Sequence, residues 1–270
     1  MRLGICALCK QSAELQDSHL IPAGVYRALP EPGNAIRNPI LVTAQTTVQT
    51  SEQVSDYLLC KGCELRFQQN GEDWLMRNRP HRNGRFPLRE ALLRSPNKST
   101  IPMGDVYKAD FDPGFDLEKL IYFGASVFWR SSAHHWNSYR HLVTPAKLPS
   151  DLEEKLRLFL LHENGFPTDL VLLITVTASK VWPLMAHPQR MKEGGRAAPN
   201  AYSFMIPGIQ FRVIYGDIPD EMKGASVTLC PHAVLVTDHV QSEIRADAHG
   251  LRSTSRLVGS IATLLSNSDN

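Results

Sequence analysis

The sequence predicts an α+β chain with a cysteine-containing N-terminal module, a helical middle and a C-terminal, mostly antiparallel sheet. Three observations predict this fold class: paired cysteines near the N-terminus, apolar residues at helical spacing between residues 116 and 163, and β-branched runs beyond residue 168. The 270 residues are 43% hydrophobic and 21% charged, near the average for globular domains, which excludes a disordered or fibrous chain. We expect three regions: the module at 1–77, a basic linker at 78–110 and an α+β domain at 111–270.

The N-terminal module is predicted from its cysteines. Four of the five cysteines form two C-x-x-C pairs, Cys6 with Cys9 and Cys60 with Cys63. Each pair can place two thiolates on one tetrahedral zinc ion, and two pairs complete a closed site. A thioredoxin-like redox pair would explain one C-x-x-C step and leave the other without a role. We therefore predict a structural Zn²⁺, with Cys230 as a small buried side chain in an apolar run.

Two helices are expected in the middle of the chain. Apolar residues recur at helical spacing from Asp116 to Arg130, which predicts an amphipathic or buried helix. Ser150 and Glu153 have the spacing of a capping box, so we expect them to begin a second helix that runs to about Glu163.

The C-terminal sheet is predicted from three runs rich in β-branched and aromatic residues, at Leu170–Thr177, Phe204–Tyr215 and Ser226–Thr237. Loops with proline and glycine separate them, which is typical of antiparallel connections. Leu251–Leu265 is expected to form a terminal helix.

The region between the module and this domain is locally basic. Its turn signals, such as Asn83-Gly84, indicate a linker. Between residues 76 and 94 there is one acidic residue, Glu90, and the following basic ones: Arg77, Arg79, Arg82, Arg85, Arg89 and Arg94. Such a strip suits contacts with backbone phosphates, although a solvated arginine-rich loop would have the same composition.

The sequence also bears on membranes and export. The longest apolar run, Leu170 to Val176, is far shorter than the roughly 18 residues that span a bilayer. The first ten residues lack the apolar stretch of a secretory signal. We therefore expect a cytoplasmic protein with no membrane partner.

A resemblance to a known family extends the analysis of the module. Residues 18–22 are Ser-His-Leu-Ile-Pro, and residues 59–64 are Leu-Cys-Lys-Gly-Cys-Glu. A C-x-x-C pair, a His-hydrophobic-Ile-Pro step and a second pair that opens a helix together resemble the zinc-containing treble-clef form of the HNH (ββα-metal) endonuclease family. The resemblance covers about residues 1–75, which are also similar to uncharacterised bacterial and prophage-type HNH-like proteins.

This resemblance implies a function and a set of site residues. The function would be metal-dependent hydrolysis of nucleic-acid phosphodiesters, of DNA rather than RNA, in a phage-defence or mobile-element setting. His19 would be the general base, and Glu64 would hold Mg²⁺ or another divalent cation, with Asp17 or Asp56 as a further ligand. The expected phosphate-binding side chains are Arg66, Arg77, Arg79, Arg82 and Arg85.

The sequence departs from the family pattern at two positions. Ser18 stands where an acidic residue or histidine is usual, and Ser55 stands where asparagine is usual. Two other hypotheses therefore remain: a catalytically inactive zinc module that binds nucleic acid, and a protein-interaction scaffold that zinc merely stabilises.

Overall fold

The computed structural model describes most of the chain and has a mixed α+β architecture. The described residues are 2–27, 39–43, 47–50, 52–102, 104–109, 115–137, 147–193, 196–218, 220–229 and 232–239. Cys230 and the helix expected at Leu251–Leu265 lie outside these ranges.

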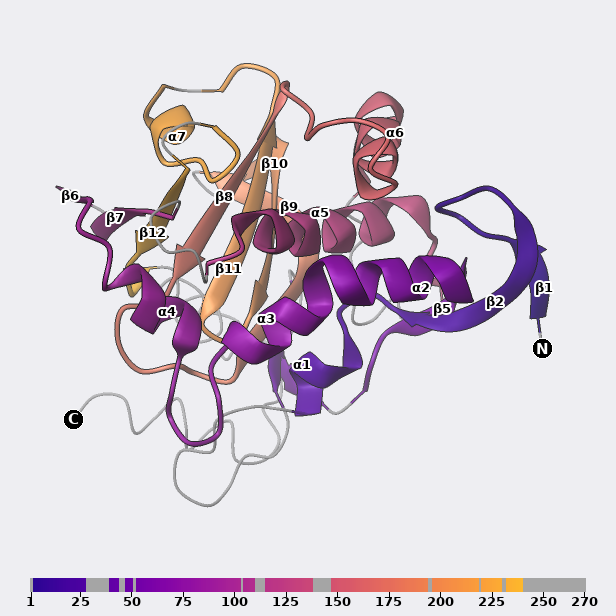
Figure 1. The fold of residues 1–270 in the computed structure, drawn as a ribbon, viewed down its shortest axis with the longest axis horizontal. Coiled ribbons are helices and arrows are strands. Elements are labelled where there is room, and N and C mark those ends of the chain that lie inside the picture. Colours follow the sequence, from indigo (N-terminus) through magenta and orange to yellow (C-terminus); the bar gives the residue numbers. More distant parts are fainter. Residues whose placement is uncertain are drawn as a thin grey trace.

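The N-terminal module is built on a small antiparallel sheet, in the order β1 (Arg2–Ile5), β2 (Ser12–His19) and β5 (Ser55–Cys60). The chain between β2 and β5 contains the short helix α1 (Ala23–Arg27). β5 leads directly into α2 (Lys61–Phe67), which continues through the π-helical turn η1 (Gln68–Glu72) into α3 (Asp73–Asn78). In Figure 1, α2 and α3 form one long rod across the front of the molecule.

A nine-stranded sheet forms the body of the molecule, in the order β4-β3-β9-β10-β11-β8-β12-β7-β6. Five of its strands come from the C-terminal half: β8 (Leu170–Val176), β9 (Leu184–Glu193), β10 (Arg196–Ile206), β11 (Ile209–Tyr215) and β12 (Ala233–Val236). Among the described strands, the pairs β3–β9 and β12–β8 are parallel and the other neighbours are antiparallel. The sheet expected in the C-terminal half is confirmed, and it is larger than the three predicted strands would form.

The remaining strands of this sheet come from the first 110 residues. They are β3 (Ile40–Val42), β4 (Thr47–Gln49), β6 (Lys98–Ile101) and β7 (Gly104–Lys108). Residues 78–110, which the sequence suggested as a linker, thus contain the helix α4 (Pro87–Leu92) and an edge of the sheet, where β7 pairs with β12. The physical reason is that β7 gains main-chain hydrogen bonds and buries Tyr107 against the core.

Helix α5 (Leu117–Ala133) lies between the sheet and the rod of α2, η1 and α3 (Figure 1). On one side, Phe123 packs against Phe204 of β10 and Phe211 of β11. On the other, Phe67 of α2 packs edge-on against Tyr122 and Trp129. A helix covered on both sides must be apolar nearly all round, and this explains the run of buried residues from 122 to 129.

Helix α6 (Ser150–Leu160) packs beside α5, but the predicted capping box is wrong. Pro149 occupies the N-cap position, so Ser150 already lies inside the helix and caps nothing. The carboxylate of Glu153 instead accepts a hydrogen bond from Ser132 of α5 at 2.6 Å. Tertiary contact with α5 has replaced the local cap.

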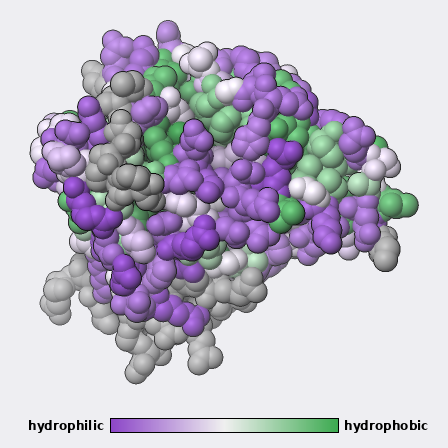
Figure 2. Space-filling view, viewed as in Figure 1, coloured by the Kyte–Doolittle hydropathy of each residue, from purple (hydrophilic) through white to green (hydrophobic). Residues whose placement is uncertain are grey.

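The surface of the face with the rod is mainly hydrophilic (Figure 2). Hydrophobic residues gather at the end of the molecule that holds β1, where Leu3 and Ile5 are exposed. Among the described helices, none is long and apolar enough to cross a membrane.

Candidate metal centre and the adjoining polar cluster

The first cysteine pair lies in the tight turn between β1 and β2. The turn is closed by two main-chain hydrogen bonds, from the N–H of Lys10 to the carbonyl of Cys6 and from the N–H of Cys6 to the carbonyl of Gln11, both 2.9 Å. Lys10 has a positive φ of 61°, which lets the chain reverse directly after Cys9. Both thiols of the pair consequently lie on one side of the turn.

The second pair is placed by the junction of β5 and α2. Cys60 is the last residue of β5, and Cys63 follows in the first turn of the helix. The N–H of Ala7 donates to the carbonyl of Leu58 at 3.0 Å, which holds the first turn against this junction. Two segments more than fifty residues apart in sequence are thereby brought face to face.

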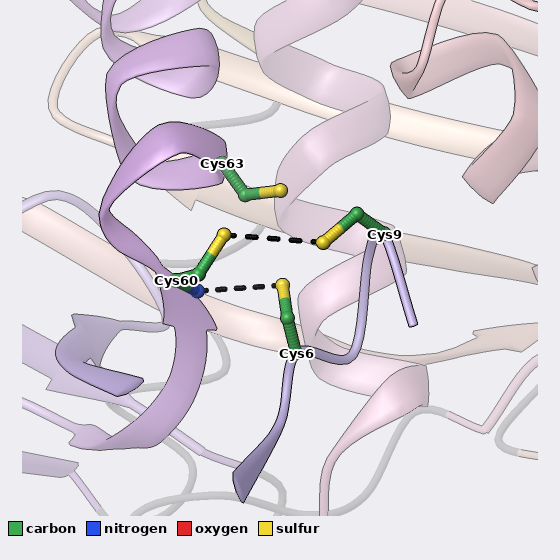
Figure 3. Close-up of side chains that lie close together, drawn as sticks. All are labelled: Cys6, Cys9, Cys60 and Cys63. Atoms are coloured by element: carbon green, nitrogen blue, oxygen red, sulfur yellow. Dashed lines mark hydrogen bonds between the residues drawn. The ribbon is translucent and has the colours of Figure 1, made fainter. Parts of the chain in front are cut away.

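The four thiols form a compact cluster (Figure 3). All four sulfur atoms lie within 4.8 Å of one another, and the Sγ atoms of Cys9 and Cys60 are 3.9 Å apart. Thiolates bound to one tetrahedral zinc ion at about 2.3 Å lie roughly 3.8 Å apart. The cluster can therefore hold a metal ion such as zinc. Within the described residues, no other group of three or more His, Cys, Asp or Glu side chains has its ligand atoms close enough together to hold a metal ion.

Hydrogen bonds already favour a thiolate in this cluster. The Cys63 thiol donates to Cys6 and lowers the pKa of Cys6 to about 4, with backbone N–H groups of Cys60, Cys9 and Leu8 acting in the same direction against burial. The same contact raises the pKa of Cys63. Since thiolates are the metal-binding form of cysteine, the backbone is arranged to support a metal ligand at Cys6.

A second, polar cluster adjoins the cysteines and centres on Glu64, in the first turn of α2. Its Oε1 atom is buried and has no hydrogen-bond partner among the described residues. Burial raises the pKa of this carboxyl. The charge of Arg130, a hydrogen bond from Ser18 to the carboxyl and the charge of His19 act to lower it, and the charge of Glu72 acts to raise it. A partly buried carboxylate oxygen without a partner is a suitable ligand for a cation.

The end of β2 supplies Ser18 and His19 to this cluster. Ser18 is buried, and its hydroxyl accepts a hydrogen bond from the N–H of Leu59 at 3.1 Å. His19 is half-buried, at the point where the strand ends. Its carbonyl accepts a hydrogen bond from Nη1 of Arg130 at 3.1 Å.

Arg130 and Glu72 are members of the cluster that the sequence analysis did not identify. Arg130 comes from α5, Glu72 comes from η1, and the two side chains form an ion pair. The guanidinium is buried and lies 4.6 Å from the centre of the Phe67 ring. One signal for Arg130 was present in the sequence, because it is a single charge at the end of an otherwise apolar helical run.

The two aspartates predicted as further ligands lie elsewhere. Asp17 is exposed, and it is not among the groups that shift the pKa of Glu64. Asp56 pairs with His134 at 2.8 Å and lies 3.9 Å from Arg2. Of the predicted site residues, His19 acts on the carboxyl of Glu64 through its charge, whereas Asp56 is paired with His134.

Two of the predicted phosphate-binding arginines are used inside the protein. Nη1 of Arg66 donates to the carbonyl of Leu161 at 3.1 Å. Arg79 donates to the carbonyl of Pro80 at 2.6 Å, and burial lowers the pKa of its guanidinium. These contacts hold both guanidinium groups against the main chain of the protein.

The other three predicted arginines are exposed at the far end of the rod. Arg85 pairs with Glu90 at 3.1 Å, while Arg77 and Arg82 are exposed at the end of α3 and in the turn after it. The basic strip of the sequence is thus reduced to a smaller exposed group.

No protein-family model, curated protein or solved structure matches this chain. What the site can do must be inferred from its geometry and chemistry.

Proposed function

We propose that this protein is a metal-dependent endonuclease of the HNH type that hydrolyses nucleic-acid phosphodiesters. One observation carries the proposal: Glu64, at the start of α2, has a buried oxygen without a hydrogen-bond partner, and His19 at the end of β2 is near enough for its charge to act on this carboxyl. A general base next to a hard oxygen ligand is the minimum that one-metal hydrolysis of a phosphodiester requires.

The charges of the cluster favour a bound cation. Ionised Glu64 and Glu72 with Arg130 have a formal sum of −1 at neutral pH. Glu64 is one protein ligand, and Mg²⁺ commonly uses one or two carboxylates with water and substrate phosphate oxygens as the remaining ligands. The fit is therefore to an ion that keeps several water ligands, some of which substrate phosphate oxygens can replace, rather than to a closed protein cage.

In this mechanism His19 takes a proton from the attacking water, and Glu64 holds the divalent ion beside the scissile phosphate. The ion, when bound, stabilises the negative charge that develops on the phosphate oxygens. Attack of the water oxygen on phosphorus breaks the bond to one sugar oxygen, which takes a proton from solvent water as it leaves. His19 then releases the proton that it accepted to solvent. The four cysteines hold zinc and fix the junction of β5 and α2, from which Glu64 projects.

The exposed Arg77 and Arg82 would hold the nucleic-acid backbone away from the cut. Arg77 lies thirteen residues beyond Glu64 along the rod, roughly 20 Å at 1.5 Å per residue. This distance corresponds to about six base pairs of B-form DNA. We therefore expect cleavage to require duplex that extends at least this far on one side of the cut.

The test is a cleavage assay with protein of confirmed zinc content, on plasmid, linear and single-stranded DNA and on RNA, with Mg²⁺, Mn²⁺, Ni²⁺ or EDTA. His19→Ala and Glu64→Gln should each lower the rate by at least about 100-fold. Asp17→Asn is the matched control on the same strand and should cleave like wild type. Cleavage that survives His19→Ala would refute this assignment.

A catalytically inactive nucleic-acid-binding zinc module is the second candidate. The observation that favours it is the ion pair of Glu72 with Arg130, which leaves Glu64 as the one carboxylate of the cluster that forms no salt bridge among the described residues. It predicts a salt-dependent gel shift without cleavage, and affinity that is unchanged in His19→Ala. A protein that neither cleaves nor shifts nucleic acid would instead be a protein-interaction scaffold.

A further inference from the structure

The buried guanidinium of Arg130 joins three elements that are distant in sequence. It belongs to α5, pairs with Glu72 of η1 and donates to the main-chain carbonyl of His19 at the end of β2, at 3.1 Å. Phe67 of α2 lies beneath it, 4.6 Å from the ring centre. Arg130 is 1% exposed, so it cannot itself contact a substrate.

Stability alone does not explain such a residue. A buried ion pair is often no more stabilising than apolar side chains of the same size. Arg130 also leaves its Nε atom without a hydrogen-bond partner, which is unfavourable in a buried position. What it does provide is a fixed distance between the end of β2 and the rod that carries Glu64, because one rigid planar group bonds to both.

We propose that Arg130, oriented by Glu72, is a positioning residue that fixes the end of β2 and thereby the place of His19 relative to Glu64. α5 is packed on the nine-stranded sheet through Phe123. The nine-stranded sheet therefore contributes to the site indirectly, because it supports α5 and α5 holds the end of β2 through Arg130. The catalytic consequence rests on the proposed nuclease function, whereas the positioning itself does not.

The structure contains a matched control for this proposal. Arg157 of α6 also donates to a main-chain carbonyl of the module, that of Leu8 at 2.7 Å, and it pairs with Glu154. It is the same kind of contact at the cysteine turn, away from His19. Loss of Arg157 should loosen that turn and leave the end of β2 in place.

The experiment compares the full-length wild type, Arg130→Met, Arg130→Lys, Glu72→Gln and Arg157→Met by hydrogen exchange. The reporter is the N–H of Leu20, which donates to the carbonyl of Val54 at 2.9 Å beside His19. We expect its exchange to rise at least about tenfold in Arg130→Met, less in Glu72→Gln and Arg130→Lys, and not in Arg157→Met. Unchanged exchange at Leu20 in Arg130→Met, or an equal rise in Arg157→Met, would overturn the proposal.

Kinetics on the same variants test the catalytic consequence, at a temperature well below the melting point of each. Arg130→Met should lower kcat by about 100-fold with KM nearly unchanged, because the misplaced base does not contact the substrate in binding. Arg130→Lys should recover part of kcat. A rise in KM alone, or equal loss in Arg157→Met, would refute positioning of His19.

The two measurements separate two kinds of failure. A wild type that cleaves nothing refutes the nuclease, and the exchange at Leu20 still decides whether Arg130 holds the end of β2. If Arg130→Met does not fold, Glu72→Gln, which retains the arginine and changes one atom of its partner, carries the same comparison.

Discussion

The cysteine cluster and the polar cluster around Glu64 lie next to each other but are assembled in different ways. The cysteine cluster takes its members from two short turns, each with two ligands three residues apart. The polar cluster takes Ser18 and His19 from β2 and one residue each from α2, η1 and α5. Local spacing determines the first, and packing of the whole molecule determines the second.

This difference predicts how each cluster fails. The cysteine cluster should be lost as a unit when one ligand is removed, because the metal binds cooperatively with folding of the module. The polar cluster should fail by degrees, since each element that supplies a residue is also held by other contacts.

The largest effect is expected for Cys60→Ser. Loss of structural zinc removes binding free energy on the order of 10 kcal/mol, so the module should unfold. Zinc stoichiometry by mass spectrometry and circular dichroism measure this result. The control is Cys230→Ser, which changes the fifth cysteine and should retain one zinc per chain. One zinc per chain in Cys60→Ser would contradict the four-cysteine site.

Arg130→Met should lower the free energy of unfolding by about 3 kcal/mol while zinc stays bound. Loss of Arg130 leaves the carboxylate of Glu72 without its charge partner. Because Glu72 is partly exposed, we expect a loss of stability at the low end of the range for broken buried ion pairs. Denaturant unfolding measures it. A loss of zinc at the same time would show that the two clusters are not separate.

Gly71→Ala tests the close crossing of the rod and α5. A Cβ at Gly71 would lie 3.0 Å from the main-chain N and Cα atoms of Phe123, which cannot move aside easily. We expect a destabilisation of about 1–3 kcal/mol. Gly62→Ala is the control on the same rod, because nothing lies within 4 Å of its Cβ position and helix propensity should raise stability by about 0.5–1 kcal/mol.

Glu64→Gln should change the pH dependence of stability. Burial raises the pKa of Glu64 in the folded state above its ordinary value of 4.5. At a pH between the ordinary pKa and the raised pKa, the folded state therefore binds more protons than the unfolded state. Wild-type stability should therefore fall, relative to Glu64→Gln, as pH rises through this window. Urea midpoints from pH 4 to 7, with zinc-loaded protein and no other divalent cation, measure the difference. A relative gain of wild type with rising pH would contradict the buried position of this carboxyl.

The smallest effect is expected from the arginines. Arg77→Ala should weaken binding equally for all nucleic-acid sequences. If Arg77 contacts a phosphate, the slope of log affinity against log salt concentration should decrease in magnitude by about 1. Arg66→Ala should leave the slope unchanged, because its guanidinium donates to the carbonyl of Leu161. If wild type and Arg77→Ala have equal salt dependence of binding, Arg77 does not contact a phosphate.

The same contrast explains which features could be predicted from sequence. The four thiols and the helix from Asp116 follow from short spacings, and the structure contains both. Arg130 and Glu72 could not be matched to each other, because 58 residues separate them and no local rule sets that distance. Strand β6 is exposed along its whole length, so its sequence lacks the alternation that marks a strand.

The proposed function requires two different cation sites, one at the four cysteines and one at Glu64. The direct measurement is the binding of Mn²⁺ to zinc-loaded protein, followed by electron paramagnetic resonance, for wild type, Glu64→Gln and Asp17→Asn. We predict one zinc per chain in all three, one Mn²⁺ in wild type and Asp17→Asn, and at least tenfold weaker Mn²⁺ binding in Glu64→Gln. Equal Mn²⁺ binding in wild type and Glu64→Gln, or none in wild type, would contradict the account.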